Sequence, residues 1–276
     1  MASCLSIVGV GLIGGSFALA SRKAGSFSKI LAVEPDGSNA AKALSLGLVD
    51  EVVSEIPSDC DAVLVACPSD RVAQWLETLQ DHPGIVFDAA SVKGAILSAT
   101  QAAIGHLPAN YVPCHPIAGL EKSGPDAADA ELFNDKLVII TPTAATDHDR
   151  CEQVVQWWQE CGARIDQMDA FEHDRVYALT SHLPHLIAFA YLQGVSAEHL
   201  PHTGGGFRDF SRIGASDSAM WSAIFELNKD ALLPRLAEFQ KNLDGLRRVI
   251  ESGDVAASRA LIDAARTQRR ELDDDC

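Results

Sequence analysis

The sequence predicts an α/β domain built on a parallel β-sheet over residues 1–169, followed by an all-α domain over residues 170–276. Three observations support this fold class. Short apolar runs alternate with helical stretches in the first part, a glycine-rich turn follows the first apolar run, and strand signals stop after about residue 170. Buried strands that alternate with helices are typical of a parallel sheet covered by helices on both faces.

The first domain is expected to alternate between strand and helix from its beginning. The apolar runs predict strands at residues 4–11, 29–34, 62–68, 84–91, 110–116, 136–142 and 162–169. The stretches between them have helical patterns at residues 13–25, 37–47, 70–80, 93–105 and 149–162. Ligands of such sheets bind outside the carboxyl ends of the strands, so the residues that follow these strands are the candidates for a site.

The second domain is expected to contain only helices. Residues 172–194 form one long helical pattern that contains Pro184, which predicts either a kink or a new helix beginning there. Further on, apolar residues recur at alternating spacings of four and three, at Leu232, Leu236, Phe239, Leu243, Leu246 and Ile250. This amphipathic face can serve as the core of the domain or as the seam of a dimer, and the sequence leaves both open.

Composition limits what the protein can bind and where it works. The 276-residue chain has a formal charge of −16 at pH 7, which argues against nucleic acid, because binding it requires a basic surface. No apolar run reaches the roughly 18 residues of a membrane span, and the N-terminus lacks the basic region of a signal peptide. We therefore expect a cytoplasmic protein without membrane contact. Its seven cysteines have no CxxC spacing, which favours reduced thiols.

A glycine pattern after the first strand predicts a dinucleotide site and a Rossmann-type domain. The pattern is G-x-G-x-x-G, and an acidic residue lies twenty residues beyond it, at the end of the second strand. The glycines allow a tight turn and close approach of a pyrophosphate, whose charge the helix N-terminus stabilises. The expected cofactor-binding residues are Gly9, Gly11, Leu12, Ile13, Gly14 and Glu34, with Ser91 nearer the nicotinamide.

Glu34 favours NAD over NADP. Its carboxylate would accept hydrogen bonds from the ribose hydroxyls of the adenosine, and it would repel a 2′-phosphate. The following Pro35-Asp36-Gly37 offers no arginine that could bind such a phosphate. We therefore expect NAD as the cofactor, with NADP less favoured.

His115 is the candidate catalytic base. It lies between Pro113 and Pro116, and a residue that precedes proline is restricted to extended backbone. His115 stands at the end of the predicted strand at residues 110–116, and Ser91 and Lys93 stand at the end of the strand at residues 84–91. All three are therefore expected to face the nicotinamide half of the cofactor. A positioned histidine can take a hydroxyl proton at neutral pH as hydride leaves. A purely structural histidine at a strand end is the alternative.

The helical domain adds further polar candidates. His182 and His185 are three residues apart and share one helical face, where they are either buried structural histidines or pocket residues. Three consecutive glycines lead into Arg208, Asp209 and Arg212, which give an acidic chain a local positive cluster. An arginine can bind a carboxylate through two hydrogen bonds, and a surface ion pair is the alternative. No metal is expected, because no acidic or sulfur partner stands at ligand spacing.

Taken together, several stretches resemble the prephenate/arogenate (cyclohexadienyl) dehydrogenase family, the NAD(P)-dependent oxidoreductases of tyrosine biosynthesis. They are, in order, GVGLIGGS, SVKG, HPIAG with EKSG, HDRV with ALTSHLPH, and GGGFRDFSRIGASDSAMW. They span nearly the whole chain, and together they are far more specific than the glycine pattern. The resemblance implies a Rossmann-type domain, an all-α dimerisation domain that makes a homodimer, and an active site in the cleft between the domains.

The resemblance also implies roles for individual residues. His115 would be the catalytic histidine, hydrogen-bonded to the hydroxyl on ring carbon C4 of the substrate, and Ser91 would assist there. Arg212 would bind a substrate carboxylate. The other residues of the substrate pocket would be His185 and His182 in its lining, Glu121, Arg208 and Asp209 as a polar gate, and Trp221 near its mouth, where the partner subunit can supply it.

The implied reaction is the oxidative decarboxylation of prephenate to 4-hydroxyphenylpyruvate, or of arogenate to tyrosine, with hydride transfer to NAD. Leu120 stands where the family usually has a hydroxyl residue, which leaves the choice between keto acid and amino acid open. Two other interpretations remain. One is another two-domain Rossmann dehydrogenase, of the β-hydroxyacid dehydrogenase or imine reductase type. The other is a redox-sensing protein that binds NAD without turning it over.

Overall fold

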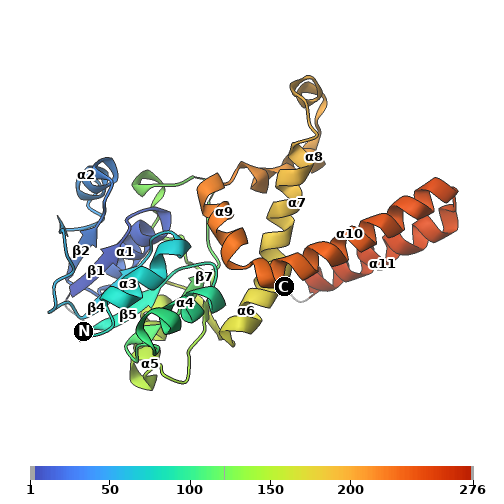
Figure 1. Ribbon diagram of the computed structural model, residues 1–276. Coiled ribbons are helices and arrows are strands. Elements are labelled where there is room, and N and C mark those ends of the chain that lie inside the picture. The colour runs from blue at the N-terminus through green and yellow to red at the C-terminus, as the bar shows by residue number, and fades with distance from the viewer. Residues whose placement is uncertain (1–3, 121, 275–276) are drawn as a thin grey trace. The chain divides into compact units, whose positions relative to one another are not determined.

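The computed structural model describes residues 4–120 and 122–274, and it contains the predicted parallel sheet (Figure 1). Six strands pair in the order β3-β2-β1-β4-β5-β6, and each of these pairs is parallel. This is the strand order of a Rossmann sheet, which binds a dinucleotide where the order reverses, between β1 and β4. The strands are β1 (Cys4–Val8), β2 (Lys29–Val33), β3 (Glu51–Val52), β4 (Ala62–Val65), β5 (Ile85–Asp88) and β6 (Tyr111–Val112).

Helices cover both faces of this sheet and create two apolar cores. One core contains Phe17 and Trp158, whose rings meet edge to face at 4.7 Å between centroids, and the other contains Val72 and Leu76. Because both faces are covered, β4 is buried along its whole length. The helices of this part are α1 (Leu12–Ala24), α2 (Gly37–Ser45), α3 (Val72–Thr78), α4 (Gly94–Ile104) and α5 (His148–Glu160), with short 3₁₀ turns η1 (Ser69–Arg71) and η2 (Pro125–Ala127).

The predicted strand at residues 110–116 is wrong in one respect, because the structure divides it at Pro113. Proline has no N–H to continue the ladder of β6, and the next N–H, that of Cys114, donates instead to the Asp88 carboxylate at 2.8 Å. The later strands therefore form a second sheet, whose first pair, β7 with β8, is antiparallel. This sheet consists of β7 (Cys114–Pro116), β8 (Leu137–Ile140) and β9 (Arg164–Gln167).

After β9 the described chain contains helices and turns but no strand, as predicted. The long pattern at residues 172–194 divides into two helices joined by a π-helical turn, η3. Pro184 lies in the first turn of the second helix, where its missing N–H costs no hydrogen bond. The elements are α6 (Ala170–Tyr177), η3 (Ala178–His182), α7 (Leu183–Leu192), η4 (Ala197–His202), α8 (Gly205–Ser211), η5 (Arg212–Ala215) and α9 (Ser218–Leu227).

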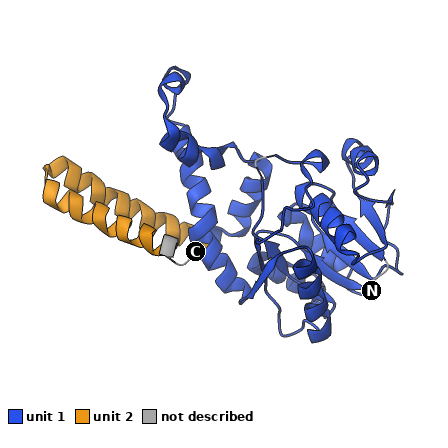
Figure 2. Cartoon of the chain, turned by 180° about the vertical axis from the view of Figure 1, so that it is seen from behind, with its two compact units in different colours: residues 1–229 blue, residues 230–276 orange. Residues whose placement is uncertain are grey.

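Residues 230–276 form a separate compact unit, drawn in orange in Figure 2. Its described part is a hairpin of α10 (Lys229–Ser252) and α11 (Val255–Asp274), which turns at Gly253 with a φ of 69°. The apolar seam predicted from the sequence lies on α10, and its residues Leu243 and Ile250 are 54% and 72% exposed. Within the described ranges, no helix is both long enough and apolar enough to cross a membrane.

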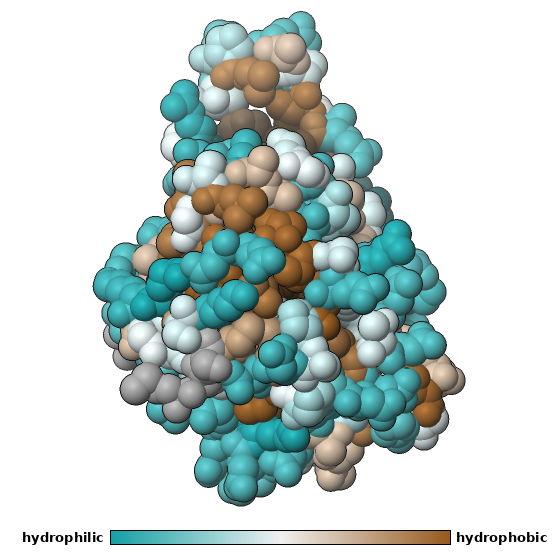
Figure 3. Space-filling view, turned by 90° about the vertical axis from the view of Figure 1, so that its left-hand side faces the viewer, coloured by the Kyte–Doolittle hydropathy of each residue, from teal (hydrophilic) through white to brown (hydrophobic). Residues whose placement is uncertain are grey.

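Most of the large exposed hydrophobic residues of the described chain follow residue 170. The face in Figure 3 is hydrophilic over most of its area, with hydrophobic side chains gathered along its middle. Single exposed apolar residues are normal on a folded protein, whereas their concentration in one part of the chain points to an interaction surface. Those after residue 170 are Phe171, Leu179, Tyr191, Leu200, Phe210, Met220, Leu233, Leu243, Leu246, Ile250, Val255, Leu261 and Ile262.

Candidate active site

The glycine loop between β1 and α1 has the shape that a dinucleotide site requires. Gly9 has a φ of 88°, a conformation that favours glycine, and a Cβ there would lie 2.9 Å from the Ala66 carbonyl oxygen. A Cβ on Gly14 would lie 2.2 Å from the Gly9 carbonyl oxygen, so a glycine is required for α1 to pack this closely. The N–H groups of the first turn of α1, including those of Leu12 and Ile13, need a partner from outside the helix, which a phosphate can provide.

A cavity of about 980 Å³ lies beside this loop, and Gly9, Gly11 and Glu34 line it. The Glu34 carboxylate accepts hydrogen bonds from the Val10 N–H at 2.9 Å and the Asp36 N–H at 3.0 Å, which hold its charge at the cavity wall. A Cβ on Gly11 would have open space around it, which leaves room for a phosphate. The residues present therefore fit the adenosine and pyrophosphate parts of a dinucleotide.

Two basic residues of the same cavity were missed by the sequence analysis. Lys42 of α2 and Arg71 of η1 both line this cavity, and Lys42 forms an ion pair with Asp126. Arg71 comes from the segment after β4, which the fold brings to this cavity, so the residues next to Glu34 in the sequence did not reveal it. A guanidinium beside the ribose position can bind a 2′-phosphate. The cavity therefore contains both an acidic residue that disfavours a 2′-phosphate and a guanidinium that can bind one.

The backbone next to His115 is clamped by a buried ion pair. Lys93 and Asp88 pair with side chains that are fully buried, and both also bind Cys114. The Asp88 carboxylate accepts the Cys114 N–H at 2.8 Å, while Lys93 Nζ donates to the Cys114 carbonyl oxygen at 2.6 Å. The expectation that Lys93 faces the nicotinamide is therefore wrong, because its ammonium is used inside the protein to hold β7 in place.

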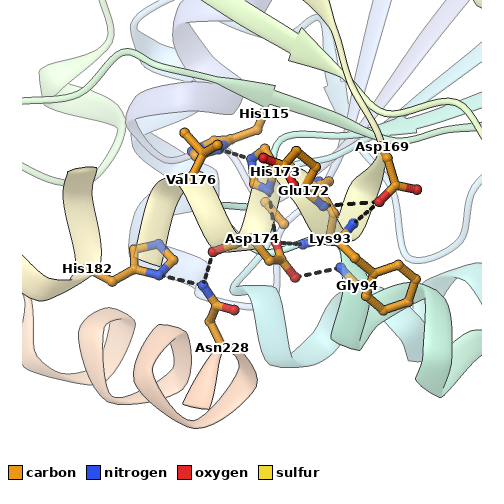
Figure 4. A network of polar contacts seen from close by, with 12 residues as sticks. Lys93, Gly94, His115, Asp169, Glu172, His173, Asp174, Val176, His182 and Asn228 are labelled. Atoms are coloured by element: carbon orange, nitrogen blue, oxygen red, sulfur yellow. Dashed lines mark hydrogen bonds and ion pairs between the residues drawn. The ribbon is translucent and has the colours of Figure 1, made fainter. Parts of the chain in front are cut away.

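His115 is linked through buried side chains to α6 (Figure 4). Its Nδ1 lies 2.8 Å from Nε2 of His173, and Nδ1 of His173 lies 2.8 Å from Oδ1 of Asp174. The Asp174 carboxylate also accepts the N–H groups of Lys93 at 2.9 Å and Gly94 at 2.8 Å, at the start of α4. The ring of Tyr177 packs against both histidines, with centroids 4.9 and 4.5 Å away. Residues of α4, β7 and α6 thus form one buried network.

Burial keeps the histidines of this network neutral at pH 7. It holds the pKa of His115 well below its usual range, and the positive charges of neighbouring groups, including Lys93, add to the effect. Burial also lowers the pKa of His173, against the opposing effect of Asp174. A neutral imidazole has one nitrogen free to accept a proton, which is the form that a general base needs.

The helical region places four more of the predicted residues close to one another, namely His182, His185, Trp221 and Arg212. His182 is buried, its Nδ1 accepts a hydrogen bond from Asn228 Nδ2 at 2.9 Å, and burial lowers its pKa to about 4. His185 stacks on Trp221 with ring centroids 3.7 Å apart. Burial lowers the pKa of His185, and the nearby charge of Arg212 lowers it further, although a hydrogen bond to the Ser181 carbonyl opposes this.

Comparisons with known proteins place the chain in a family. The sequence matches the model of the prephenate dehydrogenase nucleotide-binding domain over residues 17–167. It matches the model of the prephenate dehydrogenase dimerization domain over residues 169–263. The chain belongs to the prephenate dehydrogenase family.

Relatives of known name agree with this assignment. The chain is 36% identical to the cyclohexadienyl dehydrogenase of Zymomonas mobilis, over 91% of this chain and 89% of that protein. It is similar to the crystal structure of prephenate dehydrogenase from Aquifex aeolicus in complex with hydroxyphenyl propionate and NAD+, with a TM-score of 0.89, 32% identity and 99% of both chains covered. It is also similar to Synechocystis arogenate dehydrogenase, with a TM-score of 0.79, 27% identity and coverage of 98% and 99%.

Membership of the prephenate dehydrogenase family confirms two predictions, the family resemblance and a Rossmann-type domain followed by a helical dimerisation domain. It also supports an oxidoreductase over a protein that only binds NAD. Because the prephenate dehydrogenase domain models cover both parts of the chain, they favour this family over the alternative of a β-hydroxyacid dehydrogenase or imine reductase.

The remaining predicted site residues are held by fewer side-chain contacts. Ser91 is half-buried in the loop between β5 and α4, and no hydrogen bond joins it to His115. Arg208 and Asp209 are exposed on α8, and among the described residues their side chains have neither an ion pair nor a hydrogen bond. Glu121 lies outside the described residues, and its neighbour Leu120 is 51% exposed.

His173, Asp174 and Asn228 are the polar residues of the site that the sequence analysis did not assign. The family motif HDRV contains the first two, so the signal was present in the sequence without a role attached to it. Their role depends on how α6 packs against α4 and β7, because His173 and His115 are 58 residues apart along the chain. Asn228 is connected to this group through the carbonyl oxygen of Asp174, to which it donates at 2.9 Å.

Proposed function

We propose that this protein oxidises and decarboxylates prephenate, arogenate or both, with NAD as the hydride acceptor, in the biosynthesis of tyrosine. The observation that carries the proposal is His115, a buried and neutral histidine on a clamped backbone, in a chain that belongs to the prephenate dehydrogenase family. The product would be 4-hydroxyphenylpyruvate from prephenate and tyrosine from arogenate.

The proposed chemistry needs one base and a fixed substrate. Bound NAD would supply the acceptor for a hydride from ring carbon C4. His115 would take the proton of the hydroxyl on C4 as the hydride leaves, so that the C–O bond becomes a carbonyl. The bond between the ring and its carboxylate then breaks, carbon dioxide leaves, and the electron pair makes the ring aromatic. His115 returns its proton to the oxygen to give the phenol, so no proton is released overall.

The substrate carboxylates are proposed to bind in the helical part. Arg212 would bind one of them, because a guanidinium matches a carboxylate through two hydrogen bonds and supplies the positive charge that an acidic chain otherwise lacks. His185, with its ring stacked on Trp221, and the buried His182 would line the same pocket. Arg208, Asp209 and Glu121 would form its polar gate, and Ser91 would contact the C4 hydroxyl. These assignments rest on the family resemblance and on the proximity of Arg212 to His185.

Two structural proposals accompany this function. We propose that the domain boundary lies between residues 169 and 170, after the last strand. We also propose that the protein is a homodimer, because the matched helical domain is described as a dimerization domain and the apolar seam of α10 is exposed.

Steady-state formation of reduced cofactor tests the proposed function. Purified protein is offered prephenate and arogenate, each with NAD and with NADP. The expected result is turnover of at least one substrate with NAD, and a loss of at least about 10²-fold in kcat for His115→Asn, the lower end of what a positioned base contributes. His106→Asn is the matched control, since His106 is exposed and should be replaceable. Full activity of His115→Asn, or no turnover of either substrate, would reject the proposal.

A further inference from the structure

The Asp174 carboxylate fixes the direction of a chain of hydrogen bonds. An ionised carboxylate can only accept, and this one is oriented by the N–H groups of Lys93 and Gly94, which can only donate. These two groups belong to the N-cap and the first residue of α4, where N–H groups lack partners within the helix. The orientation of Asp174 is therefore set by the backbone of a helix, which cannot rotate as a side chain can.

The oriented carboxylate of Asp174 determines which nitrogen of His173 carries the hydrogen. Nδ1 of His173 lies 2.8 Å from Oδ1 of Asp174, so Nδ1 carries the hydrogen and donates it. Because burial keeps the ring neutral, the second nitrogen, Nε2, has no hydrogen and acts as an acceptor. The ring is completely buried, so water does not compete for this nitrogen.

His115 is the last residue in this series of hydrogen bonds. Its Nδ1 lies 2.8 Å from Nε2 of His173, which accepts, so Nδ1 of His115 must donate. In the opposite tautomer of His115, two lone pairs would face each other across this distance. The neutral ring then has its lone pair at Nε2, on the side away from His173. The other charged or titratable groups around the ring are Lys93, His182 and Tyr177.

We propose that His173 and Asp174 are positioning residues that fix His115 in the tautomer with hydrogen on Nδ1, so that Nε2 is the atom that accepts the substrate proton. The catalytic consequence rests on the function proposed above, whereas the tautomer itself does not depend on it. The helix that begins the helical region thereby determines which nitrogen of a strand histidine is basic. His173 and Asp174 need not touch the substrate for this role.

Nitrogen NMR of the ligand-free protein tests the tautomer directly. Protein labelled with ¹⁵N-histidine is compared as wild type, His173→Leu and His173→Gln, with His115→Asn used to assign the His115 signals. The expected wild-type spectrum shows His115 with hydrogen on Nδ1 and a bare Nε2. His173→Leu, which removes the acceptor and fills the space, should give a mixture of tautomers. His173→Gln should retain the wild-type form, since an amide can donate to Asp174 and accept from His115.

Kinetics of the same variants separate positioning from folding. His173→Leu is expected to lower kcat by roughly 10²-fold, at the lower end of the contribution of a positioned base, while KM changes little. His173→Gln should recover much of this loss. Thermal melts and NAD binding check that each variant is folded. If His173→Leu does not fold, His173→Asn replaces it, because its amide is too short to reach His115.

The outcomes are distinct. Hydrogen on Nε2 of wild-type His115 would overturn the inference. So would an unchanged His115 tautomer in a folded variant that lacks the acceptor at position 173. Hydrogen on Nδ1 that is lost with His173 supports it. If the wild type shows this tautomer but turns over neither substrate, the proposed function fails and the inference about His115 stands.

Discussion

At the scale of single residues, the histidines of the site differ in which nitrogen is available. His115 donates through Nδ1 to His173, so its Nε2 accepts. His182 accepts at Nδ1 from the amide of Asn228, so the hydrogen of its neutral ring lies on Nε2. The same side chain therefore serves as an acceptor at one position and as a donor at another. In each case the partner that decides this is a buried polar group on another element.

The buried histidines predict a fall in stability at low pH. Burial lowers the pKa of His182 to about 4, and it also lowers those of His115 and His173. Between about pH 6.5 and pH 4 the unfolded chain binds protons that the native state does not, so the free energy of unfolding decreases as the pH falls. Each such histidine contributes up to about 1.4 kcal/mol per pH unit in this window.

Urea unfolding at several pH values measures this effect. His182→Gln should weaken the dependence on pH, because an amide does not titrate. His148→Gln is the control, since His148 is 83% exposed in its side chain and should leave the slope unchanged. A free energy of unfolding that stayed constant between about pH 6.5 and 4 would contradict the neutral, buried state of these rings.

At the scale of elements, most of the fold follows from local patterns. The apolar runs predicted five of the six strands of the parallel sheet and missed β3, which is only two residues long, and the glycine pattern predicted the turn between β1 and α1. The second sheet was not predicted, because its cause is not local: Pro113 ends one ladder, and the buried pair of Asp88 and Lys93 then holds Cys114 where it can pair with β8. The link from His115 to His173 was missed for the same reason, since it depends on the packing of α6.

The cofactor cavity predicts how cofactor preference can be changed. Glu34 would repel a 2′-phosphate, and Arg71 lines the same cavity. Glu34→Gln should raise the ratio of kcat/KM with NADP to that with NAD by about tenfold, which corresponds to about 1.4 kcal/mol. Arg71→Ala should lower this ratio and leave kcat/KM with NAD nearly unchanged. If the ratio did not respond to either substitution, neither residue would contact the adenosine ribose.

At the scale of the whole molecule, the exposed seam of α10 predicts the oligomeric state. Leu246 and Ile250 are exposed, and a second copy of the chain would remove them from water. Light scattering should give twice the mass of the chain for the wild type. The double variant Leu246→Glu and Ile250→Glu should approach the mass of a single chain, because burying two carboxylates in an apolar seam is unfavourable.

Lys241→Glu is the matched control for the seam, since Lys241 lies on α10 between seam positions and is exposed. It introduces the same acidic side chain away from the apolar row, and the dimer should persist. A wild-type mass equal to that of one chain would contradict the dimer. An unchanged mass of the double variant would place the interface elsewhere.

The bonds of Asp174 also restrict how this protein can move. Asp174 joins α6 to the start of α4, and its neighbour His173 joins α6 to His115. A hinge at residue 169 would have to break these buried contacts together, so α6 must travel with the sheet as one rigid body. Asn228 adds to this connection, because its amide lies 2.9 Å both from the Asp174 carbonyl oxygen and from Nδ1 of His182, across the π-helical turn Ala178–His182. His115 would therefore keep its alignment with α6 in any motion that leaves these buried contacts intact.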